Sequence, residues 1–144
     1  KTLIENLIPR AAILTTNLLA AAALLNRPVA QNIAEMRQQA ELLLVMGAQA
    51  VLMKGGHAQG DDATDVLLTK DGFELFSAAR IATRNTHGTG CTLASAIAAG
   101  LAKKLSLRDA VAQAKDYLHN ALVHSNELSI GQGSGPVHHF YKLY

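Results

Sequence analysis

The sequence predicts an α/β fold in which a parallel pair of strands is followed by a β-hairpin and two long helices. In the first half of the chain, short apolar runs alternate with a helical pattern in the order strand, helix, strand. An Asp71-Gly72 turn between two further apolar runs predicts a hairpin. A glycine-rich loop, Asn85 to Thr92, then leads into an alanine-rich segment that favours a helix.

Length and composition limit the class of protein. The 144 residues fit one domain, 1–144, and a content of 49% hydrophobic and 17% charged residues indicates a globular chain. The net charge of +2 does not favour nucleic-acid binding. The single cysteine suits a cytoplasmic protein without disulfides. The longest apolar stretch, Leu18–Leu25, is too short to cross a membrane.

The first strand and helix are predicted from a short segment that follows Pro9. The apolar run Ala11–Thr15 is typical of a buried strand. Asn17 is a good N-cap for a short helix over Leu18–Leu25, because its side-chain oxygen can accept from a free helical amide.

The next helix and strand complete the strand–helix–strand pattern. Asn32 and Glu35 have the spacing of a capping box, and apolar residues follow at helical spacing as far as Leu44. Gly47 is suited to end this helix, because glycine is common at helix C-termini. Ala50–Met53 is then a second buried strand, which we expect to lie parallel to the first.

A hairpin and two helices account for most of the remaining chain. Asp65–Thr69 and Phe73–Phe76 flank the turn Lys70–Gly72. We expect one helix from about Cys91 to Lys104. A second helix starts at the Ser106 cap and carries an apolar stripe, so the two should pack antiparallel. The residues from Val137 to Tyr144 are interpreted as a tail.

The loop before the Cys91 helix is the main candidate site. Gly88 and Gly90 allow backbone conformations closed to other residues, and they allow amides to approach a ligand. The first amides of a helix have no intrahelical partner, and the helix dipole adds positive potential there. The loop is therefore a candidate phosphate cradle, with a Cys91 thiolate stabilised at its edge. The alternative is a plain glycine turn before a buried helix.

Other polar residues follow the predicted strands and could face the same crevice. Asn17 and the run Lys54-Gly55-Gly56 are in such positions, and Lys54 could reach a phosphate. The alternative for Lys54 is an ordinary solvated lysine at a strand end. His87 could contact phosphate, although a loop histidine is more often structural or solvated.

Metal binding is not favoured by the sequence. His138 and His139 are adjacent, but no carboxylate or further cysteine stands near them in the chain. Asp61, Asp62 and Asp65 resemble a cation loop without the calcium-binding pattern, so a solvated turn is the better interpretation.

Four segments together resemble a known family. They are Ala50–His57 (AVLMKGGH), Arg84–Thr92 (RNTHGTGCT), Ala110–Lys115 (AVAQAK) and Gly133–Phe140 (GSGPVHHF). They are similar to the bacterial hydroxymethylpyrimidine phosphate kinases of thiamine biosynthesis. The resemblance implies part of a ribokinase-like three-layer α/β/α sandwich with a mostly parallel sheet. It also implies transfer of a phosphoryl group from ATP, with Mg²⁺, to hydroxymethylpyrimidine and its phosphate.

The same resemblance assigns roles to the candidate residues. Gly88, Thr89 and Gly90 would form an anion hole for the transferring phosphoryl group. Cys91 occupies the position where many ribokinase relatives carry an aspartate base. Lys54-Gly55-Gly56 would lie beside the ATP phosphates.

Two departures from the family lead us to expect little activity from this chain alone. The resemblance covers roughly the C-terminal half of the family's length. The family's T-P-N-x-x-E motif reads Thr15-Thr16-Asn17-Leu18-Leu19-Ala20, so Ala20 replaces a glutamate linked to Mg²⁺ and phosphate. A half-sheet exposes an edge and apolar faces, which predicts a homodimer. The alternative is a non-catalytic fragment of an α/β fold that self-associates.

Overall fold

The computed structural model describes residues 2–55 and 62–143. These residues form two compact units, Lys1–Arg80 and Ile81–Tyr144, and each unit is described by itself. Among the described residues, the first unit holds the sheet, two α-helices and the short helices Leu3–Leu7 and Ile8–Arg10, and the second holds a pair of α-helices, the short helix His124–Glu127 and the C-terminal segment. The expectation of a single domain stays a prediction.

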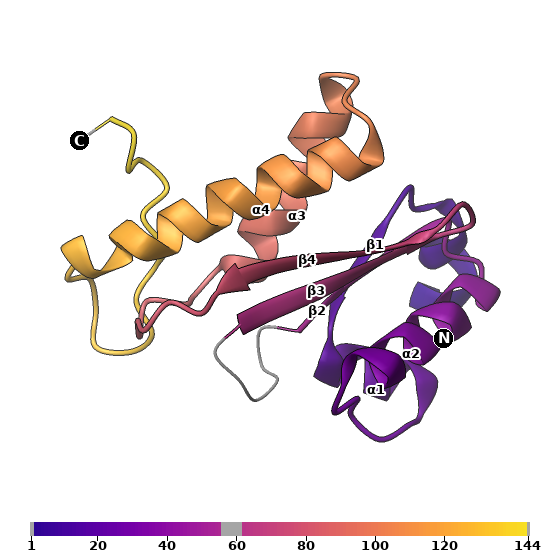
Figure 1. The fold of residues 1–144 in the computed structure, drawn as a ribbon. Helices are drawn as coiled ribbons and strands as arrows, with labels where there is room; N and C mark the ends of the chain where they lie inside the picture. The colour runs from indigo at the N-terminus through magenta and orange to yellow at the C-terminus, as the bar shows by residue number, and fades with distance from the viewer. Residues whose placement is uncertain (1, 56–61, 144) are drawn as a thin grey trace. The chain divides into compact units, whose positions relative to one another are not determined.

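The sheet of the first unit has four strands in the order β1-β2-β3-β4 (Figure 1). β1 pairs in parallel with β2, which confirms the parallel pair that the sequence predicts. β2 pairs antiparallel with β3, and β3 with β4. The strands are β1 Leu14–Asn17, β2 Ala50–Lys54, β3 Asp62–Thr69 and β4 Phe73–Ala79.

Two details of the sheet differ from the prediction. The first strand begins at Leu14 and not at Ala11, since Ala11 follows a short 3₁₀ turn over Ile8–Arg10. Within the described strands, parallel pairing is limited to β1 and β2. The connection from Lys54 to Asp62 is too short for the crossover that a parallel neighbour requires. β3 therefore returns antiparallel along β2, with Lys54 opposite Asp65.

The helices of the first unit begin at the caps that the sequence predicts. The Ala20 amide donates to Asn17 Oδ1 over 2.7 Å at the start of α1 (Leu18–Leu25). The Glu35 amide donates to Asn32 Oδ1 over 2.9 Å at the start of α2 (Ile33–Val45). In a standard capping box the carboxylate would accept from the amide of the N-cap residue, Asn32. Here the Glu35 carboxylate accepts from the amide of Gln31, one residue earlier.

The core of the first unit lies between these helices and one face of the sheet (Figure 1). Val51 of β2 is opposite Leu68 of β3, so their side chains lie on the same face. Residues on α2 pack against that face at helical spacing. The buried apolar residues of α2, β2 and β3 in this core are Met36, Ala40, Leu43, Val51, Met53, Val66 and Leu68.

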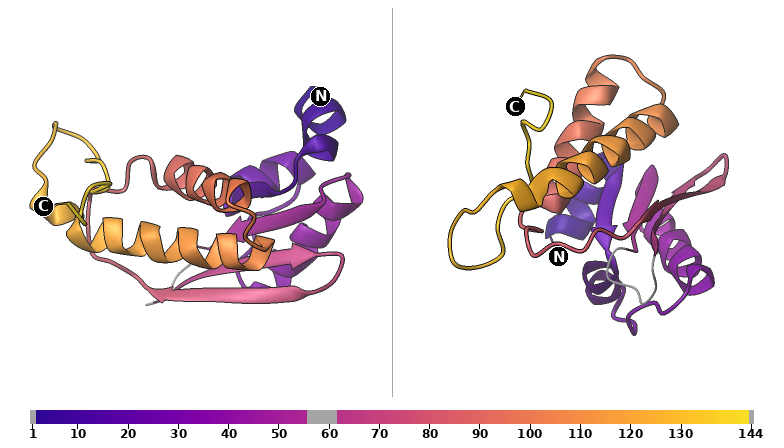
Figure 2. Two further views of the ribbon diagram at one scale, coloured as in Figure 1. Left: turned by 90° about the horizontal axis from the view of Figure 1, so that it is seen from above. Right: turned by 60° about the vertical axis from the view of Figure 1, so that its left-hand side comes forward.

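The second unit is built on two helices that pack closely, α3 (Thr89–Ala102) and α4 (Leu107–Val123) (Figure 2). A Cβ added at Gly100 would lie 2.9 Å from the Cβ of Ala110, so the glycine permits this approach. α4 starts at the predicted Ser106 cap, where the Asp109 amide donates to Ser106 Oγ over 3.1 Å. Figure 2 shows α4 returning beside α3, as the short connection predicts.

The C-terminal segment of the second unit begins with packed residues, although most of the described residues after His138 are exposed. Val137 and His138 are buried, and the His138 amide donates to the Ala121 carbonyl of α4 over 2.9 Å. The interpretation of this segment as a tail is therefore wrong at its start. Its anchoring depends on contacts with residues distant in the chain, which local sequence does not encode.

Among the residues that the structure describes, no helix combines the length and apolarity that spanning a bilayer requires.

Candidate functional site

The first turn of α3 offers uncapped backbone amides. Gly88 is the N-cap, with a left-handed φ of +82° and no side chain to cap the helix. The first helical bond runs from the Thr92 amide to the Gly88 carbonyl over 2.8 Å. Among the described residues, no backbone acceptor faces the amides of Gly90 and Cys91. These amides and the helix dipole can together bind an anion.

The helix begins at Thr89, two residues before the predicted start. The amide of Thr89 makes only a long contact of 3.5 Å with the Thr86 carbonyl. Cys91 is consequently the third helical residue, and its own amide belongs to the uncapped group. Its thiol is free and exposed. A catalytic role for this thiol stays a prediction.

Asn85 holds the start of the loop, although the sequence did not single it out as a site residue. Its side chain is 5% exposed, and its Nδ2 donates to the carbonyls of Ser125 at 2.6 Å and Leu128 at 3.2 Å. Asn85 also lies against Gly135, where an added Cβ would meet its Oδ1. An asparagine just before a glycine loop was the available signal, but its distant partners were not visible in the sequence.

His87 takes part in the site through its backbone. Its amide donates to the Gly135 carbonyl over 3.0 Å, and His87 forms a parallel bridge with Pro136. The residue is exposed. A phosphate contact by the imidazole stays a prediction.

The second glycine turn lies at the end of β2, in the first unit. Lys54 is the last strand residue, and the Gly55 amide donates to Asp65 Oδ1 over 3.0 Å. A Cβ at Gly55 would lie 2.0 Å from the Thr64 carbonyl oxygen, so only glycine fits there. Gly56 lies outside the described residues. A crevice shared with the α3 loop stays a prediction.

The expectation that Asp65 lies in a solvated turn is wrong, because the residue is buried in a strand. The residue lies within β3 and is only 6% exposed. Burial of its carboxylate is made possible by the Gly55 amide, because a buried charge needs hydrogen-bond partners. Asp62 begins the same strand, and Asp61 lies outside the described residues.

Asn17 acts in the structure as a helix cap. Its Oδ1 accepts from Ala20, the residue that stands where the resemblance places a glutamate. Ala20 is exposed in the first turn of α1, which contains no acidic residue. The cofactor contact expected of Asn17 stays a prediction.

The adjacent histidines have separate partners. His138 Nε2 lies 4.0 Å from Glu127 Oε2, so a carboxylate that is distant in the chain is near in space. His139 Nε2 lies 3.0 Å from Thr92 Oγ1 on α3. The described residues contain no group of three or more His, Cys, Asp or Glu side chains arranged to hold a metal ion.

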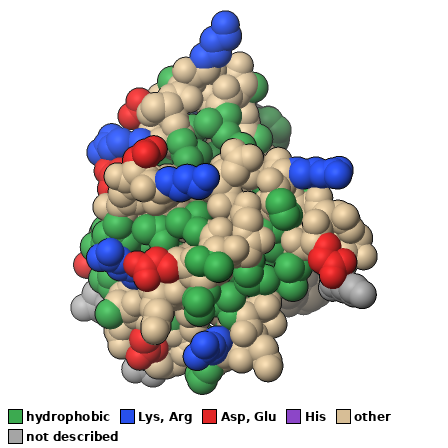
Figure 3. All heavy atoms as spheres, turned by 90° about the vertical axis from the view of Figure 1, so that its right-hand side faces the viewer, with side chains coloured by type: hydrophobic (Ala, Val, Ile, Leu, Met, Phe, Trp, Pro, Cys, Tyr) green, Lys and Arg blue, Asp and Glu red, His purple; other side chains and the backbone are tan. Residues whose placement is uncertain are grey.

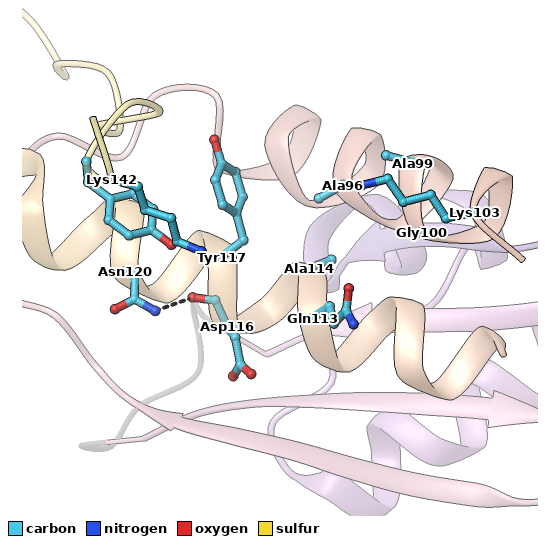
Figure 4. A pocket seen from close by; sticks show the side chains of 11 residues that line it. Ala96, Ala99, Gly100, Lys103, Gln113, Ala114, Asp116, Tyr117, Asn120 and Lys142 are labelled. Atoms are coloured by element: carbon cyan, nitrogen blue, oxygen red, sulfur yellow. Dashed lines mark hydrogen bonds between the residues drawn. The ribbon is translucent and has the colours of Figure 1, made fainter. Parts of the chain in front are cut away.

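A groove of about 670 Å³ lies along α3 and α4 (Figure 4). Small residues such as Ala96, Gly100 and Ala114 line it, together with polar residues such as Asp116 and Asn120. The lining does not include the loop Gly88–Cys91. The groove is therefore a feature separate from the uncapped amides.

A glycine loop that opens onto a helix N-terminus in an α/β fold is typical of phosphate-binding proteins. The family model for phosphomethylpyrimidine kinase matches residues 1–138, and the chain belongs to this family. It is 53% identical over 140 residues to a hydroxymethylpyrimidine/phosphomethylpyrimidine kinase of Rhizobium meliloti, and 47% identical to that of Escherichia coli. Each alignment covers 97% of this chain and 53% of the relative, so the chain spans about half the length of the curated relatives it matches.

Solved structures of related kinases confirm the mixed α/β fold. A Bacillus subtilis pyridoxal kinase, solved as an ADP complex, matches with a TM-score of 0.91 and 32% identity. That match covers 99% of this chain and 53% of the kinase. A phosphomethylpyrimidine kinase of Clostridium difficile matches with a TM-score of 0.68 and 35% identity, over 83% of this chain and 46% of the kinase.

Proposed function

We propose that this chain supplies the ATP-phosphate half-site of a kinase acting on hydroxymethylpyrimidine and its phosphate in thiamine biosynthesis. The observation that carries the proposal is the set of uncapped amides of Gly90 and Cys91 behind a left-handed Gly88. The pyrimidine substrate is favoured over pyridoxal because identity reaches 53% with the pyrimidine kinases and 32% with a pyridoxal kinase.

The chemistry of phosphoryl transfer explains the proposed roles. The substrate hydroxyl oxygen forms a bond to the γ-phosphorus while the bond from that phosphorus to the bridging oxygen of ADP breaks. The loop Gly88-Thr89-Gly90 would stabilise the charge on the transferring group through the uncapped amides of Gly90 and the adjoining Cys91. The Cys91 thiolate would accept the hydroxyl proton.

We propose that four further residues contact the nucleotide: Lys54, Gly55, Asn17 and His87. Lys54 at the end of β2 would contribute a positive charge beside the ATP phosphates, with Gly55 at the turn that follows. The described residues supply no cluster of metal ligands, and Ala20 offers no carboxylate. Mg²⁺ would then be held by ATP phosphates and water, without the one or two protein carboxylates that usually assist.

Activity of this chain alone is expected to be weak or absent, and self-association is expected. Among the described strands, β1 pairs only with β2, which leaves one of its edges open. Figure 3 shows exposed hydrophobic side chains with charged side chains of both signs among them. Exposed large hydrophobic residues of the first unit include Leu3, Leu7, Leu19, Ile33, Val45 and Leu75. A homodimer would cover part of such a surface.

Calorimetry with a non-hydrolysable ATP analogue and Mg²⁺ tests the half-site. We expect binding by the parent chain and its loss in Gly90→Asp, because a carboxylate would repel phosphate at the amides. No binding by the parent chain would contradict the half-site and favour the non-catalytic fragment. Light scattering at micromolar concentration tests the dimer, and a stable monomer would contradict it.

A further inference from the structure

The C-terminal segment Gly135–His139 contacts both flanks of the α3 loop. On one flank, the Gly135 carbonyl accepts from the His87 amide over 3.0 Å. On the other flank, His139 Nε2 lies 3.0 Å from Thr92 Oγ1. The uncapped amides of Gly90 and Cys91 lie in the chain between these two contacts.

The segment is itself firmly anchored. The hydroxyl of Tyr117 donates to the His139 carbonyl over 2.9 Å, and the His138 amide donates to the Ala121 carbonyl of α4 over 2.9 Å. Val137 is 1% exposed. The backbone that carries the imidazole of His139 is thus fixed by α4, so His139 can restrain the residue it contacts.

Thr92 is well placed to transmit this restraint. It is 8% exposed, and its amide makes the first helical hydrogen bond of α3, to the Gly88 carbonyl over 2.8 Å. One residue therefore closes the first turn through its backbone and contacts His139 through its side chain. A shift of Thr92 would move the Gly88 carbonyl and the amides between them.

We propose that His139 is a positioning residue that acts through Thr92 to hold the first turn of α3 in the geometry that binds an anion. The inference rests on the proposed phosphate-binding function of the loop, and it assigns that site a support from the C-terminal segment. His139 itself need not contact the ligand.

The test measures first-turn opening and anion binding separately. Hydrogen exchange at the residue-92 amide, followed by NMR, reports opening of its bond to Gly88. Inorganic phosphate is then titrated against alkylation of Cys91 by iodoacetamide, because Cys91 is exposed and is the one cysteine of the sequence. The variants are His139→Leu, Thr92→Val, their combination, and His139→Gln as the conservative replacement.

We expect protection of the residue-92 amide to fall about fivefold in each single variant, as for loss of one hydrogen bond. The phosphate concentration that half-protects Cys91 should rise by a similar factor. The double variant should resemble the single variants, and His139→Gln should recover most of the loss. His119→Leu on α4 is the matched control and should change neither quantity. Thermal unfolding confirms that each variant is folded.

Unchanged exchange at residue 92 in both single variants would overturn the inference. Faster exchange with an unchanged half-protecting phosphate concentration would also overturn it, because the support would then not reach the anion site. If phosphate fails to protect Cys91 even in the parent chain, the anion site itself is contradicted. Restraint of the first turn by His139 is then judged by the exchange measurement alone.

Discussion

The carboxylate of Asp65 accepts a hydrogen bond from the backbone amide of Gly55, with Oδ1 and N 3.0 Å apart. This bond ties the turn after β2 to the neighbouring strand β3, and both residues are buried. It therefore fixes where the chain leaves Lys54, the residue proposed to approach the ATP phosphates.

Replacing Asp65 tests this relationship. Asp65→Ala leaves the buried amide of Gly55 without its acceptor, and we expect the free energy of unfolding to fall by about 1–3 kcal/mol. Asp65→Asn keeps an acceptor oxygen and should cost less. Urea denaturation followed by circular dichroism measures both losses. A larger loss in the asparagine variant than in the alanine variant would contradict this account.

Gly55 itself should tolerate no side chain. The Cβ in Gly55→Ala would lie 2.0 Å from the Thr64 carbonyl oxygen, so the backbone must shift. We expect a loss of ~2 kcal/mol or more in the free energy of unfolding. Gly72→Ala in the hairpin turn is the control, since no atom lies within 4 Å of its added Cβ. Equal losses in the two variants would show that the close approach at Gly55 is unimportant.

Gly88 is needed for its backbone conformation and not for space. Its φ is +82°, while an added Cβ would meet no atom within 4 Å. Gly88→Ala should therefore lower the free energy of unfolding by ~1 kcal/mol, and Gly88→Asn should lower it less because asparagine tolerates left-handed φ. Phosphate binding should weaken in the same order. Gly133→Ala, also in open space but without a positive φ, should leave both measurements unchanged.

The packing of α3 on α4 depends on the pair Gly100 and Ala110. Gly100→Ala places a Cβ 2.9 Å from that of Ala110, and we expect a lower melting temperature. Adding Ala110→Gly removes the nearer clashing atom but keeps the Cα at 3.1 Å, so it should restore only part of the loss, offset by the helix propensity of glycine. Thermal denaturation of the single and double variants measures this coupling. Purely additive losses would mean that the two residues do not interact.

Placing a glutamate at Ala20, where the resemblance to the kinase family implies one, should stabilise α1 and favour nucleotide binding with Mg²⁺. A carboxylate in the first turn interacts with the helix dipole and can complete a capping box with Asn17. We expect a gain of about 0.5 kcal/mol in the free energy of unfolding for Ala20→Glu. Calorimetry should show tighter ATP-analogue binding with Mg²⁺ and no gain without it. Ala20→Gln can complete the same capping box without the negative charge, so the difference between the glutamate and glutamine variants measures the effect of the charge.

The sequence by itself determined where three helices begin, through their side-chain caps. Asn17, Asn32 and Ser106 each bind an amide three residues further along the chain, so the signal and its partner lie in one short window. The hairpin around Asp71-Gly72 was predicted for the same reason. The parallel pair β1–β2 followed from the order of the elements, and the glycine loop was recognised from its own residues.

Only the tertiary structure decided which distant residues support the site. Asp65 meets Gly55 ten residues away, Asn85 meets the Ser125 carbonyl, and His139 meets Thr92 on α3. Spacing in a sequence encodes neighbours within a helix or a strand, but it does not encode which segments meet after the chain has folded. For that reason the sequence predicted neither the burial of Asp65 against Gly55 nor the contact of His139 with Thr92, whereas packing made each residue a partner of a glycine turn.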